Sequence, residues 1–294
     1  MKRLFFFKDI DSHYIINLCG IIFRIKHKTK HEYPIAESIG INNTEKRNPK
    51  IILSLTSYPK RIGTAHYTIN SLLRQTVKPD KILLWLTDEE FPNREKDLPE
   101  SILKLKNLGL TIEWCEPIKN FKKNIPAFRK YPDDIVITVD DDVYYKENLV
   151  ESLYNAYLNN PKNIYAKRIS RRRLVNNHSI KRLPIREHCF ERTQEASYLN
   201  FLNGAGGILY PPHSLCIEAL NGSKKILNDD YFMWAMAVKN NTKIAEVTGF
   251  DESLEFVEDA LVCSFSKTKG NDVNWADITL EEYPELINII GENR

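Results

Sequence analysis

Three consecutive aspartates, Asp140, Asp141 and Asp142, follow an apolar run at residues 135–139. The run predicts a buried strand that ends in acidic groups, which are costly there unless a cation neutralises them. Because strand side chains alternate, we expect Asp140 and Asp142 to point one way and Asp141 the other. Two carboxylates suit Mg²⁺ or Mn²⁺, which also binds phosphate oxygens and water. The alternative is a solvated acidic turn before a helix over 147–158, with Asp142 as its cap.

A second acidic pair, Asp229 and Asp230, directly precedes a mostly apolar stretch with helical spacing. Asn228 or Asp229 can cap this helix, which places Asp230 in the first turn, where the helix dipole favours a negative charge. Two acids at the start of a helix are also common as simple caps. The pair therefore leaves a chemical and a purely structural interpretation open.

Apolar segments of strand and helix type alternate from about residue 49. This alternation predicts an α/β fold with a mostly parallel central sheet, helices on both faces and a single main domain. Ligands bind to such sheets outside the carboxyl ends of the strands, so the ends of the first, second and fourth strands are expected to face one crevice. The expected elements are strands over 50–55, 81–86, 110–114 and 135–139, and helices over 65–75 and 100–108.

The polar residues at these strand ends have side chains that suit a nucleotide. Thr56 and Ser57 can form hydrogen bonds, Tyr58 can stack on a base, and Arg61 can meet a phosphate. Asp88 follows the second expected strand. An ordinary turn at residues 57–59 is the alternative interpretation.

Three segments, 51–59, 122–134 and 139–142, resemble nucleotide-sugar-dependent glycosyltransferases of the GT-A fold. The likeness is strongest to bacterial transferases related to glycosyltransferase family 2 that act in lipopolysaccharide or capsule assembly. It covers roughly residues 49–262 in motif order. It implies that Asp140 and Asp142 form the metal- and diphosphate-binding DXD motif around Asp141.

The same resemblance implies roles for residues elsewhere in the chain. Thr56, Tyr58 and Arg61 would lie near the nucleotide, and Lys123 near its base or phosphates. Asp230 would be the catalytic base and Asp229 its acidic neighbour. Because these enzymes often have glutamate where this sequence has aspartate, the assignment of the base to Asp230 or Asp229 stays open. Attack by the acceptor hydroxyl would invert the anomeric centre. No histidine follows His213 to serve as the metal ligand of many retaining enzymes.

Three glycines lie between the two acidic clusters, within residues 202–212. In the resembled enzymes a loop at this place contacts the donor sugar and the acceptor, which marks Gly206 and Gly207 as candidate contacts. Glycine lets the backbone approach a ligand closely and present N–H donors. A tight turn without ligand contact is the alternative.

The composition limits the class of protein. The chain has 294 residues, of which 42% are hydrophobic and 28% charged, as in soluble globular proteins. Its net charge of +3 does not favour nucleic acid as a partner. The five cysteines are scattered and odd in number, which disfavours disulfides and a zinc site and favours a reducing cytoplasm.

The N-terminal segment differs from the rest of the chain. Residues 14–23 are apolar but too few to span a bilayer, and a basic stretch at 24–31 follows. We expect either an arm on the inner face of the cytoplasmic membrane or a hairpin that turns near residues 19–20. The expected division is an N-terminal arm or hairpin (1–48), a GT-A domain (49–265) with nucleotide-binding (49–145) and acceptor (146–265) halves, and a C-terminal tail (266–294).

The densest positive charge lies at residues 167–173, with Lys181, Arg182 and Arg186 after it. Ordinary solvated charge is one interpretation, and contact with an anionic acceptor or membrane surface is the other. The polar segment 170–200 is a candidate mobile lid on the acceptor side.

Together these observations predict a metal-dependent glycosyltransferase, of the hexosyltransferase class, with Mn²⁺ or Mg²⁺ as cofactor. It would move a sugar from a nucleotide-diphosphate sugar to a glycan or glycolipid in bacterial surface polysaccharide synthesis. One alternative is a non-catalytic scaffold of the same fold that binds glycan or nucleotide. The other is a sugar nucleotidyltransferase, which should carry a Gly-rich loop with a basic residue after the first strand, where Thr56, Ser57 and Tyr58 stand instead.

Overall fold

The computed structural model describes residues 5–10, 13–18, 21–26, 33–176, 179–183, 195–216, 225–247, 255–257 and 274–292, the first three ranges by their backbone. The chain divides into two compact units, Met1–Pro34 and Ile35–Arg294. In the first unit, β1 (Phe5–Ile10), β2 (His13–Leu18) and β3 (Ile21–Lys26) form an antiparallel sheet in that order. The turn predicted near residues 19–20 lies outside the described residues.

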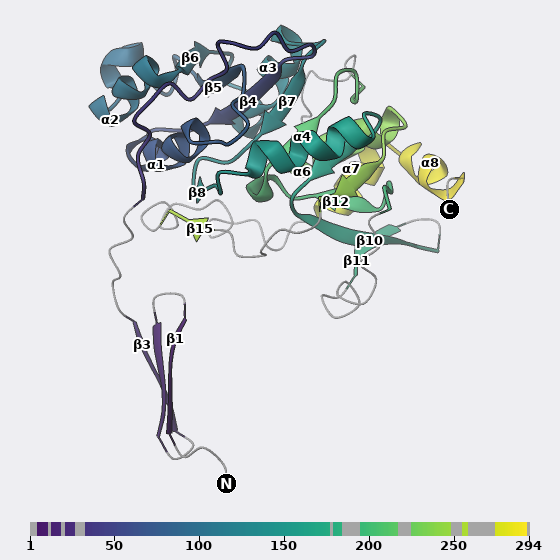
Figure 1. The fold of residues 1–294 in the computed structure, drawn as a ribbon. Coiled ribbons are helices and arrows are strands. Elements are labelled where there is room, and N and C mark those ends of the chain that lie inside the picture. The colour runs from purple at the N-terminus through teal and green to yellow at the C-terminus, as the bar shows by residue number, and fades with distance from the viewer. Residues whose placement is uncertain are drawn as a thin grey trace. The chain divides into compact units, whose positions relative to one another are not determined.

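The second unit is built around a seven-stranded sheet (Figure 1). Every neighbouring pair in it is parallel except those made by β13, which runs antiparallel to both β9 and β7. The α/β class with a mostly parallel sheet is therefore confirmed. In spatial order the strands are β14 (Ile244–Glu246), β9 (Ile164–Ala166), β13 (Ile208–Tyr210), β7 (Ile135–Thr138), β4 (Ile51–Thr56), β5 (Lys81–Leu86) and β6 (Leu110–Trp114).

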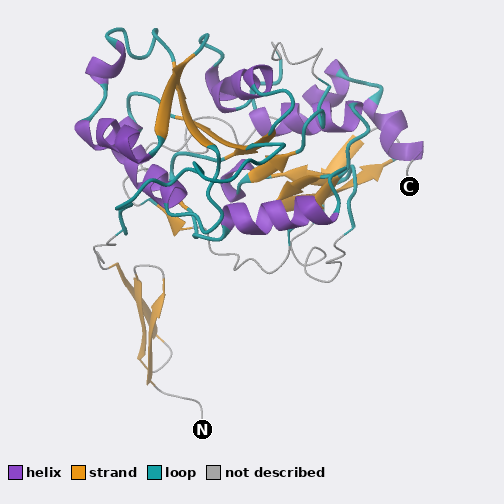
Figure 2. Cartoon of the chain, turned by 45° about the horizontal axis from the view of Figure 1, so that its top comes forward, coloured by secondary structure: helices purple, strands orange, loops and turns teal. Residues whose placement is uncertain are grey.

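Helices cover both faces of this sheet (Figure 2). Successive strand residues alternate between two cores, with Ile52 and Leu83 in one and Leu53 and Leu84 in the other. Both faces of the strands are therefore apolar. The first core includes α3 (Ile125–Lys130), α6 (Asp229–Lys239), α7 (Trp275–Glu282) and α8 (Leu286–Glu292), and the second α1 (Ile62–Leu73), α2 (Glu100–Leu103) and α4 (Leu149–Asn159).

Several predicted bounds were wrong. The helix expected over 100–108 is a single α-turn, α2, followed by 3-10 structure over Lys104–Leu108, which ends at Gly109 with a left-handed φ of 118°. The strand expected over 135–139 ends at Thr138, so the aspartate run begins two residues beyond it. The helix expected over 147–158 begins at Leu149, with Asn148 and not Asp142 as its cap.

A smaller antiparallel sheet, in the order β11-β10-β12, lies beside α6. Its strands are β10 (Ile169–Val175), β11 (Ser179–Arg182) and β12 (Asn200–Leu202). The segment 170–200, predicted as a lid, therefore begins and ends in paired strands, while residues 184–194 lie outside the described part. A two-stranded pair, β8 (Val143–Tyr144) with β15 (Glu255–Phe256), is the last of the strands in the described residues.

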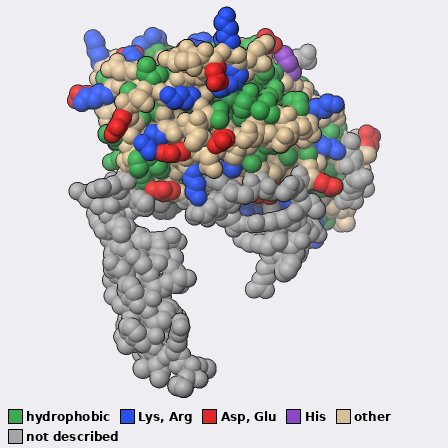
Figure 3. All heavy atoms as spheres, in the orientation of Figure 1, with side chains coloured by type: hydrophobic (Ala, Val, Ile, Leu, Met, Phe, Trp, Pro, Cys, Tyr) green, Lys and Arg blue, Asp and Glu red, His purple; other side chains and the backbone are tan. Residues whose placement is uncertain are grey.

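Charges of both signs are mixed over the described surface in Figure 3. Neither sign gathers into one large patch on that face, as the small net charge of +3 leads us to expect. Among the helices that the structure describes, none is long and apolar enough to cross a membrane.

Candidate functional site

The acidic clusters meet at the carboxyl edge of the central sheet. Asp140 follows the end of β7, while the start of β13 pairs with that end, Ile208 opposite Thr138. Because β13 runs antiparallel, the glycine loop before it reaches the same edge as the aspartates. Helix α6 begins there with Asp229 and Asp230, and Asn228 is its cap, since its side chain accepts a hydrogen bond from the Tyr231 N–H.

Lys123 joins the two acidic clusters. Its Nζ lies 2.5 Å from Oδ1 of Asp140 and 2.9 Å from Oδ2 of Asp229. The side chain is 10% exposed, and despite this burial the neighbouring carboxylates Asp140, Asp229 and Asp230 hold the pKa of Lys123 well above its usual value. Lys123 is thus a permanent positive charge between residues that lie far apart in the sequence.

Arg61 joins the other two aspartates. Its guanidinium donates to Oδ1 of Asp141 at 2.6 Å and to Oδ2 of Asp142 at 2.7 Å, and Ser57 Oγ donates to Asp141 Oδ2 at 2.5 Å. Asp141 and Asp142 thus share Arg61, while Asp140 pairs with Lys123. Because β7 ends at Thr138, strand alternation does not apply to the aspartates, and the joint role of Asp140 and Asp142 at one metal ion stays a prediction.

Gly204 is the glycine that faces the charged cluster. Its N–H donates to Oδ2 of Asp230 at 3.2 Å, and a Cβ built on it would lie 2.9 Å from Asp230 Oδ1 and 3.3 Å from Lys123 Nζ. Gly206 instead packs against Arg168, and Gly207, at φ 86°, packs against Leu149. Only the first of these glycines contacts the acidic pair.

Tyr145 fixes the glycine loop against the aspartate run. Its hydroxyl accepts a hydrogen bond from the Asp140 N–H at 2.9 Å and donates to the carbonyl of Ala205 at 3.1 Å. The side chain is buried, and burial raises the pKa of Tyr145 well above its usual value, so this hydroxyl keeps its proton. Neither Tyr145 nor Gly204 could be identified as a site residue from its sequence position, because both act through contacts made only in the folded chain.

The cluster has more negative than positive charge. Five aspartates face Arg61 and Lys123, the two cations that pair with them. Burial, followed by repulsion from Asp229, raises the pKa of Asp230 from 3.8 to about 7. Burial, followed by repulsion from Asp140, raises the pKa of Asp142 to about 6. Asp230 can therefore exchange a proton near neutral pH, as a general base must.

The donor chemistry of this edge fits a hard divalent cation. Asp140 and Asp142 offer carboxylate oxygens in a region with excess negative charge, and the Asp140 side chain is 28% exposed. Among the residues that the structure describes, no group of three or more His, Cys, Asp or Glu side chains is arranged to hold a metal alone. Mg²⁺ in proteins usually binds one or two carboxylates and completes its shell with water or phosphate oxygens, which matches the number of carboxylates here.

The remaining predicted nucleotide contacts lie in different surroundings. Thr56 Oγ1 donates to the carbonyl of Trp85 at 2.8 Å, and the half-buried ring of Tyr58 lies 5.7 Å from the Arg61 guanidinium carbon. Asp88 is 58% exposed and pairs with Arg94. It is Glu90 that faces inward, where it accepts hydrogen bonds from Thr87 and the buried Lys122. Lys122 also donates to the Ser57 carbonyl at 3.1 Å, which brings Glu90 next to the first strand end.

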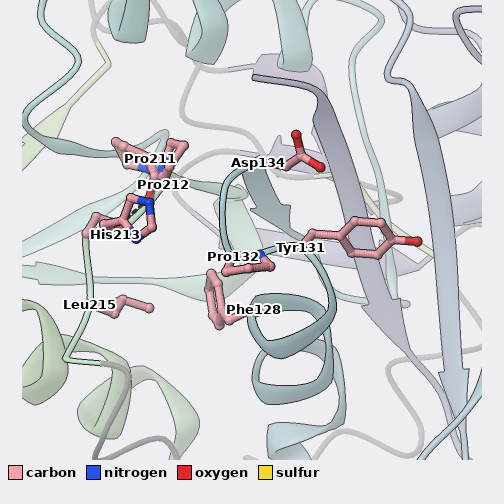
Figure 4. Close-up of a pocket in the computed structure, with 9 residues that line it drawn as sticks. Phe128, Tyr131, Pro132, Asp134, Pro211, Pro212, His213 and Leu215 are labelled. Carbon is pink, nitrogen blue, oxygen red and sulfur yellow. Dashed lines mark hydrogen bonds between the residues drawn. The ribbon is translucent and has the colours of Figure 1, made fainter. Parts of the chain in front are cut away.

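A separate hollow lies at the other end of the strands, away from the carboxyl ends of the parallel strands (Figure 4). Phe128 and Pro132 line one side of it, and Pro211, Pro212 and His213 the other. These residues flank the start of β7 and the end of β13, since Tyr210 pairs with Val136. The hollow is therefore remote from the carboxylate cluster.

No protein-family model and no curated protein sequence matches the chain. Among solved structures, it is similar to residues 1–349 of S. aureus TarS, with 15% identity, a TM-score of 0.45, and coverage of 70% of this chain and 59% of that one. A mannosyltransferase from Pyrobaculum calidifontis, in complex with GDP-Man and Mn²⁺, has 13% identity, a TM-score of 0.45 and coverages of 74% and 58%. GalNAc-T7 with UDP, GalNAc and Mn²⁺ has 13% identity, a TM-score of 0.44 and coverages of 67% and 41%. The chain thus spans less than two thirds of each of these structures.

Proposed function

We propose that this protein is a metal-dependent glycosyltransferase that moves a sugar from a nucleotide-diphosphate sugar to a hydroxyl of a glycan or glycolipid. The observation that carries this proposal is the convergence of Asp140, Lys123 and the Asp229-Asp230 pair at the carboxyl edge of the sheet. A donor diphosphate needs positive charge and an acceptor hydroxyl needs a base, and this edge supplies both within one cluster.

In the proposed reaction, Asp230 takes the proton of the acceptor hydroxyl as its oxygen bonds to the anomeric carbon. The bond from that carbon to the diphosphate breaks, and the nucleoside diphosphate leaves with the electron pair. Gly204 N–H holds one oxygen of Asp230, and Lys123 fixes Asp229 and Asp140 on either side. A divalent ion held by Asp140 and Asp142 would supply charge neutralisation for the leaving diphosphate.

The finer points of the proposal rest on the sequence resemblance. Asp230 as the base favours a single displacement with inversion, and Asp229, tied to Lys123, is its less suited neighbour. Thr56, Ser57, Tyr58, Arg61 and Lys123 would surround the nucleotide. The acceptor would belong to a bacterial surface glycan, such as lipopolysaccharide or capsule, made on the cytoplasmic side with peripheral contact to the membrane.

The first test is hydrolysis of a panel of nucleotide sugars by the purified protein, with and without Mn²⁺. We expect metal-dependent release of one nucleoside diphosphate, which would also identify the donor. Absence of release across the panel, together with absence of metal-dependent nucleotide binding, would refute the proposal.

In the same assay, Asp142→Asn should reduce metal-dependent release by about a hundredfold or more, because a metal-binding carboxylate supplies several kcal/mol through its ion. Asp133→Asn is the matched control, since that aspartate is 83% exposed, pairs with His213 and precedes the start of β7, at the opposite end of the strand from Asp142. It should leave release unchanged. Equal losses in the two variants would mean that the effect is one of surface charge.

Gly204→Ala should lower turnover by about a hundredfold, because a methyl group there would displace the Asp230 carboxylate and the Lys123 ammonium by tenths of an ångström or more. The melting temperature should change little, since the crowded atoms are the far ends of side chains. Gly63→Ala is the control, as nothing lies within 4 Å of its new methyl group. Full turnover in Gly204→Ala would show that the reaction occurs elsewhere.

A further inference from the structure

The small β11-β10-β12 sheet separates the arginines of the basic stretch onto two faces. Ser170 pairs directly with Phe201 and therefore lies on the same face as Phe201, and Arg172 lies on that face too, two residues further along β10. Arg171 and Arg173 point to the other face, where Arg173 is exposed and pairs with Lys181. Three consecutive arginines thus have different surroundings.

Arg172 lies against two aromatic rings that also contact each other. Its guanidinium carbon lies 4.3 Å from the ring centroid of Phe201 and 5.3 Å from that of Tyr231. The Nε atom is buried with no hydrogen-bond partner, and no carboxylate of the described residues lies within ion-pair distance of the guanidinium. Burial lowers the pKa of Arg172, as expected for a cation without a counter-charge.

A second arginine strengthens the positive charge at this point. Arg182 on β11 stands directly opposite Arg172, and like charges in that position destabilise a sheet. The two rings orient Arg172, but they do not neutralise either cation. Such a pair is stabilised when an anion binds between the arginines.

Arg172 contacts the helix that carries the candidate base. Tyr231, which contacts Arg172, follows Asp230 in the first turn of α6, and Phe201 lies three residues before Gly204. A group bound at Arg172 therefore belongs to the acceptor side of the site. The part of the acceptor next to this bound group would carry the hydroxyl that Asp230 deprotonates.

We propose that Arg172, with Arg182, binds an oxyanion of the acceptor, a phosphate or a carboxylate, next to the hydroxyl that is glycosylated. The inference rests on the proposed function and names its acceptor class as an anionic glycan. Arg172 is a binding residue in this proposal and takes no part in proton transfer. Arg173, on the opposite face of the same strand, has no such role.

Three sugars that differ only at carbon 6 provide the test: methyl glucoside, its 6-phosphate and the corresponding methyl glucuronide. Binding to the full chain is measured by ligand-observed NMR, which needs no turnover. We expect at least one of the anionic sugars to bind about tenfold or more tightly than the neutral sugar, and the comparison of phosphate with glucuronide identifies the preferred oxyanion.

Arg172→Gln should remove this preference, weakening the anionic sugar about 10- to 100-fold and leaving the neutral sugar unchanged. Arg172→Lys should retain part of the preference for the anionic sugar. Arg182→Gln should weaken the preference without a risk to folding, because Arg182 is exposed. Arg173→Gln is the matched control and should have no effect on the preference. Equal binding of all three sugars, or equal losses in Arg172→Gln and Arg173→Gln, would overturn the inference.

Donor hydrolysis by the same proteins separates this inference from the proposed function. Hydrolysis without an anion preference overturns the acceptor class alone. An anion preference without hydrolysis of any nucleotide sugar overturns the proposed glycosyltransferase activity alone.

Discussion

Asp230→Asn is expected to abolish sugar transfer, with a loss of about 10²–10⁴-fold in turnover, because the amide cannot accept the proton of the acceptor hydroxyl. Donor binding should remain, since Lys123, Asp140 and Asp142 are unchanged. In the unmodified protein, the proposed turnover should rise with pH through about 7, as Asp230 loses its proton. Nucleoside diphosphate release in the presence of an acceptor, measured from pH 5 to 9, checks both points.

The same substitution should stabilise the ligand-free protein. The pKa of Asp230 rises from 3.8 in the unfolded chain to about 7 in the folded one, so the folded state retains a proton that the unfolded state has lost between these values. The free energy of unfolding therefore falls as the pH rises from about 4 to 7, because the Asp230 carboxylate becomes charged in the folded protein. Above pH 7 this loss of stability stays constant. Asparagine removes this cost, so the variant should gain roughly 1–4 kcal/mol at pH 8 and almost nothing at pH 4.

Asp229→Asn distinguishes the two acids. Asp229 pairs with Lys123, so its substitution should destabilise the protein at pH 8 and leave measurable turnover. Normal turnover in Asp230→Asn together with loss of turnover in Asp229→Asn would assign the base to Asp229. A destabilised Asp230→Asn variant would show that the charge of Asp230 is not costly in the folded protein.

Lys123→Met should lower the free energy of unfolding by about 3–5 kcal/mol at pH 7.5, because it leaves Asp140, Asp229 and Asp230 partly buried without their shared cation. The deficit should shrink toward pH 5 as Asp230 takes up a proton. Urea unfolding at the two pH values measures both effects. The raised pKa of Lys123 means that its contribution is present at neutral pH and is lost only in strong alkali.

Lys130→Met provides the matched control for Lys123→Met. Lys130 pairs with Glu113 at 2.6 Å, but its side chain is 46% exposed, so its loss should cost about 0–1 kcal/mol. Adding Asp229→Asn to Lys123→Met should restore part of the lost stability, because one unpaired charge is then removed. Similar costs for the two lysine variants would show that the carboxylate cluster is solvated and not held by Lys123.

The order of strands and helices could be predicted from the sequence because each element has its own apolar pattern. The parallel strands around 51–56 and 81–86 are apolar on both faces, which indicates a sheet covered on both sides. The three-residue strand β13 has no such signal, and neither does its antiparallel direction. Both depend on long-range pairing with β7 and β9, which local sequence does not encode.

The candidate site could be predicted in outline only. The residue types of Asp140, Asp142 and Asp230 indicate chemistry, and the structure brings their clusters together through Lys123. The role of Gly204 depends on the direction of β13, and that of Tyr145 on a hydrogen bond across the loop. These contacts exist only after the sheet has formed.

The place of β13 in the central sheet has a consequence for biosynthesis. Strands β4, β5, β6 and β7 can pair as soon as residue 138 has left the ribosome, but the outer edge of β7 then stays open until residues 208–210 are made. An open edge is a template for wrong pairing between nascent chains. Insertion of β13 closes that edge, admits β9 and β14 to the sheet, and carries Gly204 to the acidic cluster. The event that closes the open edge of β7 is therefore the same one that completes the candidate site.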